Sequence, residues 1–317
     1  MAEGRGTVLA IGEQADFDTV QTTYTQAYRI TSETLGGQAV RWRGRDALAQ
    51  GGAGLRHMMF EEGIDVAFDV ELEATLEGMG MLWKHILWDA ATTTGSGPYT
   101  HTREITGTRP SVPLTMEIVR GNTGKSDVVT GARITSAEWS VAVGELVKVK
   151  ISVIGKSAAR QNTGTIPSLS GARLVVKHHK LTSAVVTWNS GSYALRSFSL
   201  KLDRKLARND KLGSLYTGEP PASDFTDVTC EITRVQADEV WRTAHEAGTQ
   251  SDLVIGFTDG TRSITWTVQS AMITACSDPI SAVGEIMQSA TFVALDDDTD
   301  PGLKQVEVNS QATGEAA

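Results

Sequence analysis

The sequence has few cysteines, few aromatic residues and no long apolar run. Two cysteines, Cys230 and Cys276, among 317 residues can form one disulfide at most. This excludes a disulfide-stabilised secreted scaffold and makes a reducing cytosol the simplest compartment. No segment approaches the roughly eighteen apolar residues of a membrane-spanning helix, and the apolar run near the N-terminus is too short for a signal-peptide core. We therefore expect a soluble protein that no standard signal exports.

Basic residues are also scarce relative to acidic ones. The chain has 29 Lys and Arg against 38 Asp and Glu, a net charge of −9 at pH 7. A protein that binds nucleic acid by neutralising phosphates needs a dominant basic surface, which this composition argues against. The remaining composition, 40% hydrophobic and 21% charged, is that of a globular protein long enough for one large or two ordinary domains.

No motif in the sequence marks an enzyme. There is no G-x-S-x-G turn for a serine nucleophile and no Cys and His signature of a thiol enzyme. His178 and His179 lie in an extended run, where adjacent side chains point to opposite faces and cannot bind one metal together. GNTGKS (121–126) resembles a phosphate-binding loop, but Val119 stands where that loop needs glycine. We expect a surface turn there, no catalysis, and neither cofactor nor metal.

The C-terminal stretch DDDTDPGLKQVE has carboxylates at the spacing of a calcium loop. These carboxylates are Asp296, Asp298, Asp300 and Glu307. However, Pro301 occupies the place of the glycine that makes the sharp turn of such loops, and the flanking segments do not have helical periodicity. A flexible acidic tail over 296–317 is the favoured interpretation, with calcium binding as the alternative.

Most of the chain consists of short alternating runs separated by Gly, Thr, Ser and Asn, a pattern typical of antiparallel β proteins. The clearest predicted strands are 64–73, 114–119, 146–154, 197–203, 227–233, 253–258, 263–269 and 289–295. Two other segments, 74–88 and 236–248, show helical spacing of apolar residues. Each predicts one amphipathic helix on a sheet, with Trp83 and Trp241 as core anchors and Gly248 ending the second helix.

The order of these elements occurs twice. Each copy has a basic loop, an alternating strand, a tryptophan-containing helix, further strands and a closing phrase, ITS…AVGEL (134–146) or ITA…AVGEI (273–286). Module 1 is the longer copy because of an insertion at 89–111. We therefore predict a tandem duplication, divided into module 1 (1–156), a linker or arm (157–173), module 2 (174–295) and the tail.

The strand IDVAFDVELE (64–73) alternates so regularly that one face is apolar and the other acidic. Its acidic residues are Asp65, Asp69, Glu71 and Glu73. The corresponding strand of module 2, DVTCEIT (227–233), has Asp227 and Glu231 at equivalent alternation. Clustered like charges cost stability, so a functional reason for them is expected.

Three stretches together resemble the major tail tube proteins of long-tailed, non-contractile bacteriophages. They are LAIGEQADFDTVQT…YRITSETL (9–35), ITSAEWSVAVGELVKVKISVIGK (134–156) and VTWNSGSYALRSFSLKLDRKLARND (186–210). In that family the phrase G-E-L-V leads into a final long strand that closes on G-K. Here those positions are Gly144 to Val147 and Gly155 with Lys156.

The resemblance implies a mainly β protein with a minor α contribution. It implies two tandem tail-tube-type β-sandwich or barrel modules, each with one flanking helix and a long loop. Strands of neighbouring modules would pair edge to edge around a lumen, and stacked rings would form a tube that conducts DNA from capsid to cell. One-module subunits of the family form six-fold rings, so two modules per chain suit a three-fold ring, with a hexamer as the alternative.

The resemblance also implies a location, partners and site residues. The location is the virion tail, after synthesis in the bacterial cytoplasm. The partners are further copies of the chain, the tape measure protein, and the tail terminator and tip proteins. The residues expected to face the lumen, where a negative wall lets DNA pass without binding, are Asp65, Asp69, Glu71, Glu73, Asp227 and Glu231. The basic loop residues expected to dock on the next ring are Arg41, Arg43, Arg45, Arg56, Arg204, Lys205, Arg208 and Lys211.

Two other interpretations remain open from the sequence. One is an inner tube subunit of a contractile tail or of a secretion apparatus, which would share the architecture. The other is a β-sandwich module that binds carbohydrate or a host surface. A lone binding module, however, gives no reason to duplicate both the helix and the closing AVGE strand in the same order.

Overall fold

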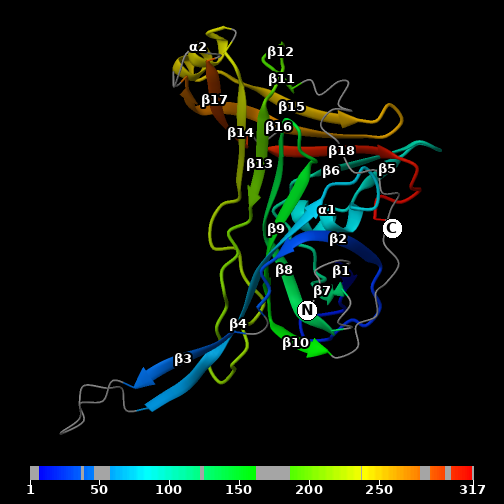
Figure 1. Ribbon diagram of the computed structural model, residues 1–317, viewed down its shortest axis with the longest axis vertical. Coiled ribbons are helices and arrows are strands. Elements are labelled where there is room, and N and C mark those ends of the chain that lie inside the picture. The colour runs from blue at the N-terminus through cyan, green and yellow to red at the C-terminus, as the bar shows by residue number, and fades with distance from the viewer. Residues whose placement is uncertain are drawn as a thin grey trace, which may run out of the picture.

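The computed structural model describes residues 7–36, 39–45, 58–121, 125–161, 186–236, 238–278, 286–296 and 301–315. Within these residues the chain is mostly β with two short helices, which confirms the predicted fold class (Figure 1). The strands of the first half are β1 (Val8–Glu13), β2 (Gln26–Glu33), β3 (Ala39–Arg45), β4 (Met58–Glu73), β5 (Thr92–Thr94), β6 (Tyr99–Glu104), β7 (Leu114–Arg120), β8 (Lys125–Ala142), β9 (Lys148–Gly155) and β10 (Ser157–Gln161). Those of the second half are β11 (Val186–Trp188), β12 (Gly191–Tyr193), β13 (Ser197–Asp203), β14 (Asp227–Val235), β15 (Gln250–Thr258), β16 (Ser263–Ser277), β17 (Met287–Val293) and β18 (Leu303–Asn309).

One antiparallel sheet, which we call the long sheet, runs through both halves of the chain. Its order is β2, β4, β9, β8, β13, β14, β17 and β16. The β8 to β13 pairing joins the predicted modules, with Ser197 opposite Ala142 and Asp203 opposite Ser136. Because side chains alternate along each strand, one face of this sheet is buried and the other is polar.

Strands β8 and β16 each belong to two sheets, and each bends at an equivalent residue. The first part of β8 pairs with β7 and β10 before its second part enters the long sheet. The bend falls at Gly131, whose φ is +64° and whose added Cβ would lie 2.9 Å from the Phe17 ring. In β16 the bend falls at Ser270, with φ of 47°. Both strands also carry a bulge four residues later, at Thr135 and Thr274 respectively, which supports the proposed duplication.

The second sheet of module 2 packs over the buried face of the long sheet, and we call it the covering sheet. Its order is β12, β11, β15, β16, β18, β6 and β5. Strand β6 comes from the insertion of module 1, so the insertion extends a sheet of the other module. Figure 1 shows β18 lying between β16 and β6.

The prediction of a flexible tail over 296–317 is wrong for β18. This strand pairs with β16 on one side and β6 on the other, and Leu303, Gln305, Glu307 and Asn309 are buried. Its buried positions are mostly polar, so the sequence lacks the apolar alternation that predicts a strand. Glu307 is held by Arg103 of β6, while Asp298 and Asp300 of the calcium-loop pattern lie outside the described residues.

The helices are α1 (Gly80–Leu87) and α2 (Val240–Ala247), shorter than the predicted segments. Trp83 of α1 stacks on Trp139 of β8 with ring centroids 5.3 Å apart, and its edge meets Trp266 of β16 at 5.3 Å. Trp241 of α2 is fully buried, and Gly248 ends that helix with a left-handed φ of 63°. The Trp83 cluster joins residues of both modules, so the two modules share one core.

Two predicted loops contain strands. The first part of the module 1 basic loop forms β3, which pairs with the start of β4 in a hairpin that projects from the body of the subunit (Figure 1). The predicted linker 157–173 begins with β10, paired with β8. Residues 162–173 of that linker, and 122–124 of the GNTGKS stretch, lie outside the described residues.

Candidate functional site

The polar face of the long sheet carries the predicted acidic residues, and lysines of β9 lie among them. Lys150 Nζ lies 2.9 Å from Asp69 Oδ2, and Lys148 Nζ lies 3.5 Å from Glu71 Oε1. Ser152 of β9 donates a hydrogen bond of 2.7 Å to Asp69 Oδ1. The acidic strand is therefore partly neutralised by its direct neighbour in the sheet.

Charge alternates along one row across four adjacent strands of this face. Glu71 of β4 is opposite Lys150 of β9, which is opposite Glu138 of β8, which is opposite Lys201 of β13. Opposite charges in directly facing positions stabilise an antiparallel pair, whereas like charges would repel. Within this row no two carboxylates face each other. Elsewhere on the face Asp203 of β13 lies opposite Asp227 of β14, and Lys205 pairs with both.

The polar face remains acidic in sum. The carboxylates on it are Asp65, Asp69, Glu71, Glu73, Glu138, Asp203, Asp227 and Glu231, and the lysines are Lys148, Lys150, Lys201 and Lys205. The hydrogen bond from Ser152 and the charge of Lys150 hold the pKa of Asp69 below its usual range. Asp69 therefore stays ionised at neutral pH, and the pKa of Lys150 is raised by the same contact.

The module 2 part of the face has fewer charges. Glu231 of β14 lies opposite Ser199 and Thr291, and Asp227 pairs with Lys205 at 2.9 Å. Thr233 of module 2 corresponds to Glu71 of module 1. Each lies two residues after the equivalent acid, Glu231 or Asp69, and faces the equivalent residue of the next strand, Ser289 or Lys150. Serine and threonine thus replace much of the ion-pair network.

A family model for phage tail tube proteins matches residues 4–294. The chain belongs to the phage tail tube protein family. It is a structural component of a phage tail, and its family implies self-assembly into a tube. A search of curated proteins finds no match. No helix within the described part of this tube subunit is long and apolar enough to cross a membrane.

The two basic loops of the tail tube subunit lie side by side and are tied to each other. Arg41 Nε of β3 lies 3.2 Å from Asp65 Oδ2, and Arg41 also reaches Asp210 of the module 2 loop at 3.1 Å. Arg208 pairs with both Asp65 and Asp210. Asp65, predicted to face the lumen, is therefore the common partner of two arginines that were predicted to reach the next ring.

Arg204 is buried, so its predicted contact with a neighbouring ring is wrong. Its guanidinium donates to the Ile86 carbonyl at 3.1 Å and to the Thr106 carbonyl at 2.9 Å, and it stacks over Trp88 at 4.2 Å. Burial lowers its pKa to about 9. Arg204 satisfies carbonyl groups at the end of α1, where a helix leaves its last carbonyls unpaired.

The other basic residues differ in availability. Lys205 pairs with Asp203 at 3.1 Å and with Asp227. Arg43 is exposed and pairs only loosely with Glu62 at 3.3 Å, and Lys211 is exposed. The Arg45 side chain and the whole of Arg56 lie outside the described part of the chain.

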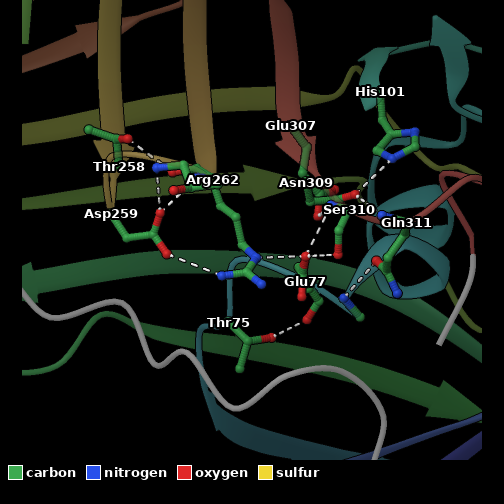
Figure 2. Close-up of polar contacts among 12 residues, drawn as sticks. Thr75, Glu77, His101, Thr258, Asp259, Arg262, Glu307, Asn309, Ser310 and Gln311 are labelled. Atoms are coloured by element: carbon green, nitrogen blue, oxygen red, sulfur yellow. Dashed lines mark hydrogen bonds and ion pairs between the residues drawn. The ribbon is translucent and has the colours of Figure 1, made fainter. Parts of the chain in front are cut away.

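A polar network around the buried Glu77 carboxylate joins the two modules, and no sequence pattern predicts it (Figure 2). Glu77, just before α1, accepts hydrogen bonds from Arg262 of module 2 at 2.7 Å and from the Ser310 hydroxyl at 2.6 Å. Nearby, Arg103 pairs with Glu307 at 3.2 Å, and both side chains are almost fully buried. Burial raises the pKa of Glu307. These contacts fix the two modules and the C-terminal strand to one another.

Proposed function

We propose that three copies of the chain close into a ring whose lumen is lined by the polar face of the long sheet. The proposal depends mainly on one observation, that this sheet is continuous across both modules. Module 1 supplies β2, β4, β9 and β8, and module 2 supplies the equivalent set β13, β14, β17 and β16. Three chains would thus supply the six sets of strands of a pseudo-six-fold barrel, which leaves no open sheet edge.

The joint between modules is the template for the joint between copies. Within the chain, β8 of module 1 pairs with β13 of module 2. The equivalent strands at the ends of the long sheet are β16 and β2, so β16 of one copy would pair with β2 of the next. Such a head-to-tail contact closes a ring when its rotation divides the circle evenly.

The composition of the polar face suits a passage for DNA. Excess carboxylates repel phosphates, while two of the interleaved lysines, Lys150 and Lys148, are held by carboxylates of the same chain at 2.9 and 3.5 Å. Lysines occupied in this way release few counterions from DNA, so affinity along the wall stays low. The lumen positions of Asp69, Glu71, Glu73, Asp227 and Glu231 follow from this arrangement, with Asp65 at its edge.

Contacts between stacked rings would use the projecting β3–β4 hairpin. It carries exposed apolar side chains, Trp42 and Met59, at 58% and 55% exposure, beside exposed Arg43. Lys211 and Leu212 lie exposed on the adjacent loop. This is a smaller basic set than the sequence predicts, because Arg41, Arg208 and Lys205 are held within the subunit.

Electron microscopy combined with native mass spectrometry of the purified chain tests the proposal. We expect hollow rings or tubes with three chains per ring and DNA conduction as their role, with the tape measure, terminator and tip proteins as partners in the virion. Monomers at all concentrations, or rings of six chains, would contradict the three-fold ring. A sheath around tubes in the native virion would instead identify a contractile tail.

A further inference from the structure

Each end of the long sheet has an edge that no other described strand covers. At one end, the last residues of β16 pair with β17 on one side. At the other end, the residues that follow β2 pair with β4. Within the described part of the chain, no strand lies on the outer side of Ser277 or of Leu35. The inference below rests on the proposed ring, in which these two edges meet.

The internal joint shows which backbone groups must be free at such an edge. Arg204 N–H donates to the Thr135 carbonyl, and Val143 N–H donates to the Arg196 carbonyl. Since hydrogen-bonded pairs recur at every second residue, Leu200 also turns its N–H and C=O toward β8, opposite Trp139.

Leu35 holds the place of Leu200 in module 1. Glu33 is opposite Val70, and Thr34 N–H donates to the Asp69 carbonyl at 3.1 Å. Because Thr34 bonds toward β4, the N–H and C=O of Leu35 point away from it, toward the open edge. By the same equivalence, Asp278 of a neighbouring copy holds the place of Trp139.

Both edge groups of Leu35 are occupied in the subunit by side chains. Leu35 N–H donates to Glu33 Oε2 at 2.6 Å, and Arg120 Nη2 donates to the Leu35 carbonyl at 2.8 Å. Arg120 Nε also donates to Glu33 Oε1 at 2.8 Å, and its other nitrogen pairs with Asp127. The two side chains therefore satisfy the hydrogen bonds that a neighbouring strand would make.

Module 2 has no such pair at the internal joint. The position of Glu33 is taken by Phe198, which is buried and has no group that could accept a hydrogen bond. There β8 is always present, so an edge needs no protection. Of the two equivalent edges, only the one at Leu35 has the polar pair, and within the described residues that edge has no neighbouring strand, whereas the edge at Leu200 pairs with β8.

We propose that Glu33 and Arg120 form a releasable cap on the module 1 edge. The cap holds Leu35 in the free subunit and yields its N–H and C=O to the β16 edge of a second copy when the ring closes. An open strand edge invites unregulated pairing, and side chains that occupy it suppress that pairing. Both side chains are partly exposed, at 19% and 27%, so water can replace them during release.

The rate of assembly tests the cap. Glu33→Gln weakens the cap while leaving Arg120 paired with Asp127, and Arg120→Lys removes the forked donor but keeps the charge. We expect each folded variant to assemble at least about threefold faster than the native chain, as measured by light scattering over a concentration series. Glu104→Gln, which breaks an ion pair with Lys304 of 2.9 Å away from the edges, should leave the rate unchanged. An equal or lower rate in both folded cap variants overturns the cap.

A cysteine cross-link separates the cap from the ring itself. In a Cys276→Ser background, Gly36→Cys with Ser277→Cys should link one copy to the next, because these positions correspond to Lys201 and Glu138 at the internal joint. Gly36 has open space for the added side chain. The matched pair Lys201→Cys with Glu138→Cys should link within one chain. If the cysteine variant forms rings that cross-link, but the cap variants assemble no faster than the native chain, only the cap is refuted. If neither rings nor cross-links between copies form, the proposed function is refuted.

Discussion

The two modules of the subunit are alike on their buried faces and differ on their polar ones. Phe68 and Val70 of β4 correspond to Cys230 and Ile232 of β14, and all four are buried. On the opposite face, Lys150 of module 1 corresponds to Ser289 of module 2. Packing of a shared core constrains the buried side chains, whereas a solvated wall needs only polarity. The comparison indicates that an exact charge pattern is not required over the whole polar face.

The strongest test asks whether the modules can unfold separately. Trp139 is buried between Trp83, Trp266 and Phe257, so Trp139→Ala removes an aromatic side chain from the core of both modules. We expect a loss of about 3–5 kcal/mol in the free energy of unfolding, with one transition for the whole chain. Denaturant unfolding followed by circular dichroism measures this. Trp42→Ala, at an exposed tryptophan, is the control, and a second transition unaffected by Trp139→Ala would show independent modules.

The next test concerns the buried ion pair between Arg103, in the insertion found only in module 1, and Glu307 of the C-terminal strand. Glu307→Gln leaves the Arg103 charge buried with an amide in place of its carboxylate, which we expect to cost about 3 kcal/mol. Thermal unfolding measures the loss. Replacing both residues with leucine should recover much of it, because no unpaired charge remains. Equal losses in the single and double variants would argue that the strand contacts, and not the ion pair, carry the stability.

The equivalent bends at Gly131 and Ser270 predict opposite responses to substitution. Gly131→Ala forces a side chain into a left-handed backbone 2.9 Å from the Phe17 ring, and we expect a loss of about 2 kcal/mol. Ser270→Gly relieves a positive φ of 47°, and we expect a gain of about 0.5–1 kcal/mol. Urea midpoints of the two variants check the signs. A loss at both positions would show that the Ser270 side chain is needed at its bend.

The smallest expected effect compares the two polar faces directly. Lys150→Glu faces Glu71 and Glu138 with a third carboxylate, and we expect a loss of about 1 kcal/mol at low salt. Ser289→Glu, at the equivalent position, faces Thr233 and Ser277 and should cost less than half as much. Salt should reduce the first loss more than the second. Unfolding at two ionic strengths measures both, and equal losses would mean that the charge row of module 1 contributes little.

The sequence predicts the strands whose buried positions are apolar. The observed bounds of β13 equal the predicted 197–203, and β14 starts at the predicted residue. Strand β18 is not predicted, because its buried positions are mostly polar and depend on partners such as Arg103, far away in the chain. The first half of β8 is not predicted either. Its consecutive residues are buried on both faces, so apolar and polar residues do not alternate along it.

The same limit applies to the site. Alternation places the acids of β4 on one face, but only strand pairing reveals the lysines of β9 beside them. The sequence predicts Arg204 on a loop surface, because nothing near it in the chain shows that it contacts the end of α1, more than one hundred residues away. The cap at Leu35 requires three segments to meet, which no local pattern encodes.

Strand β18 lies beyond the residues that the family model matches, and its partner β6 lies in the insertion of module 1. Each would be left with a buried, uncompensated charge without the other, since Arg103 and Glu307 belong to different segments. A lineage could therefore not acquire or discard one of them alone without a folding penalty. Among relatives of this chain, the β5–β6 segment of the insertion and the C-terminal strand β18 should be present or absent together.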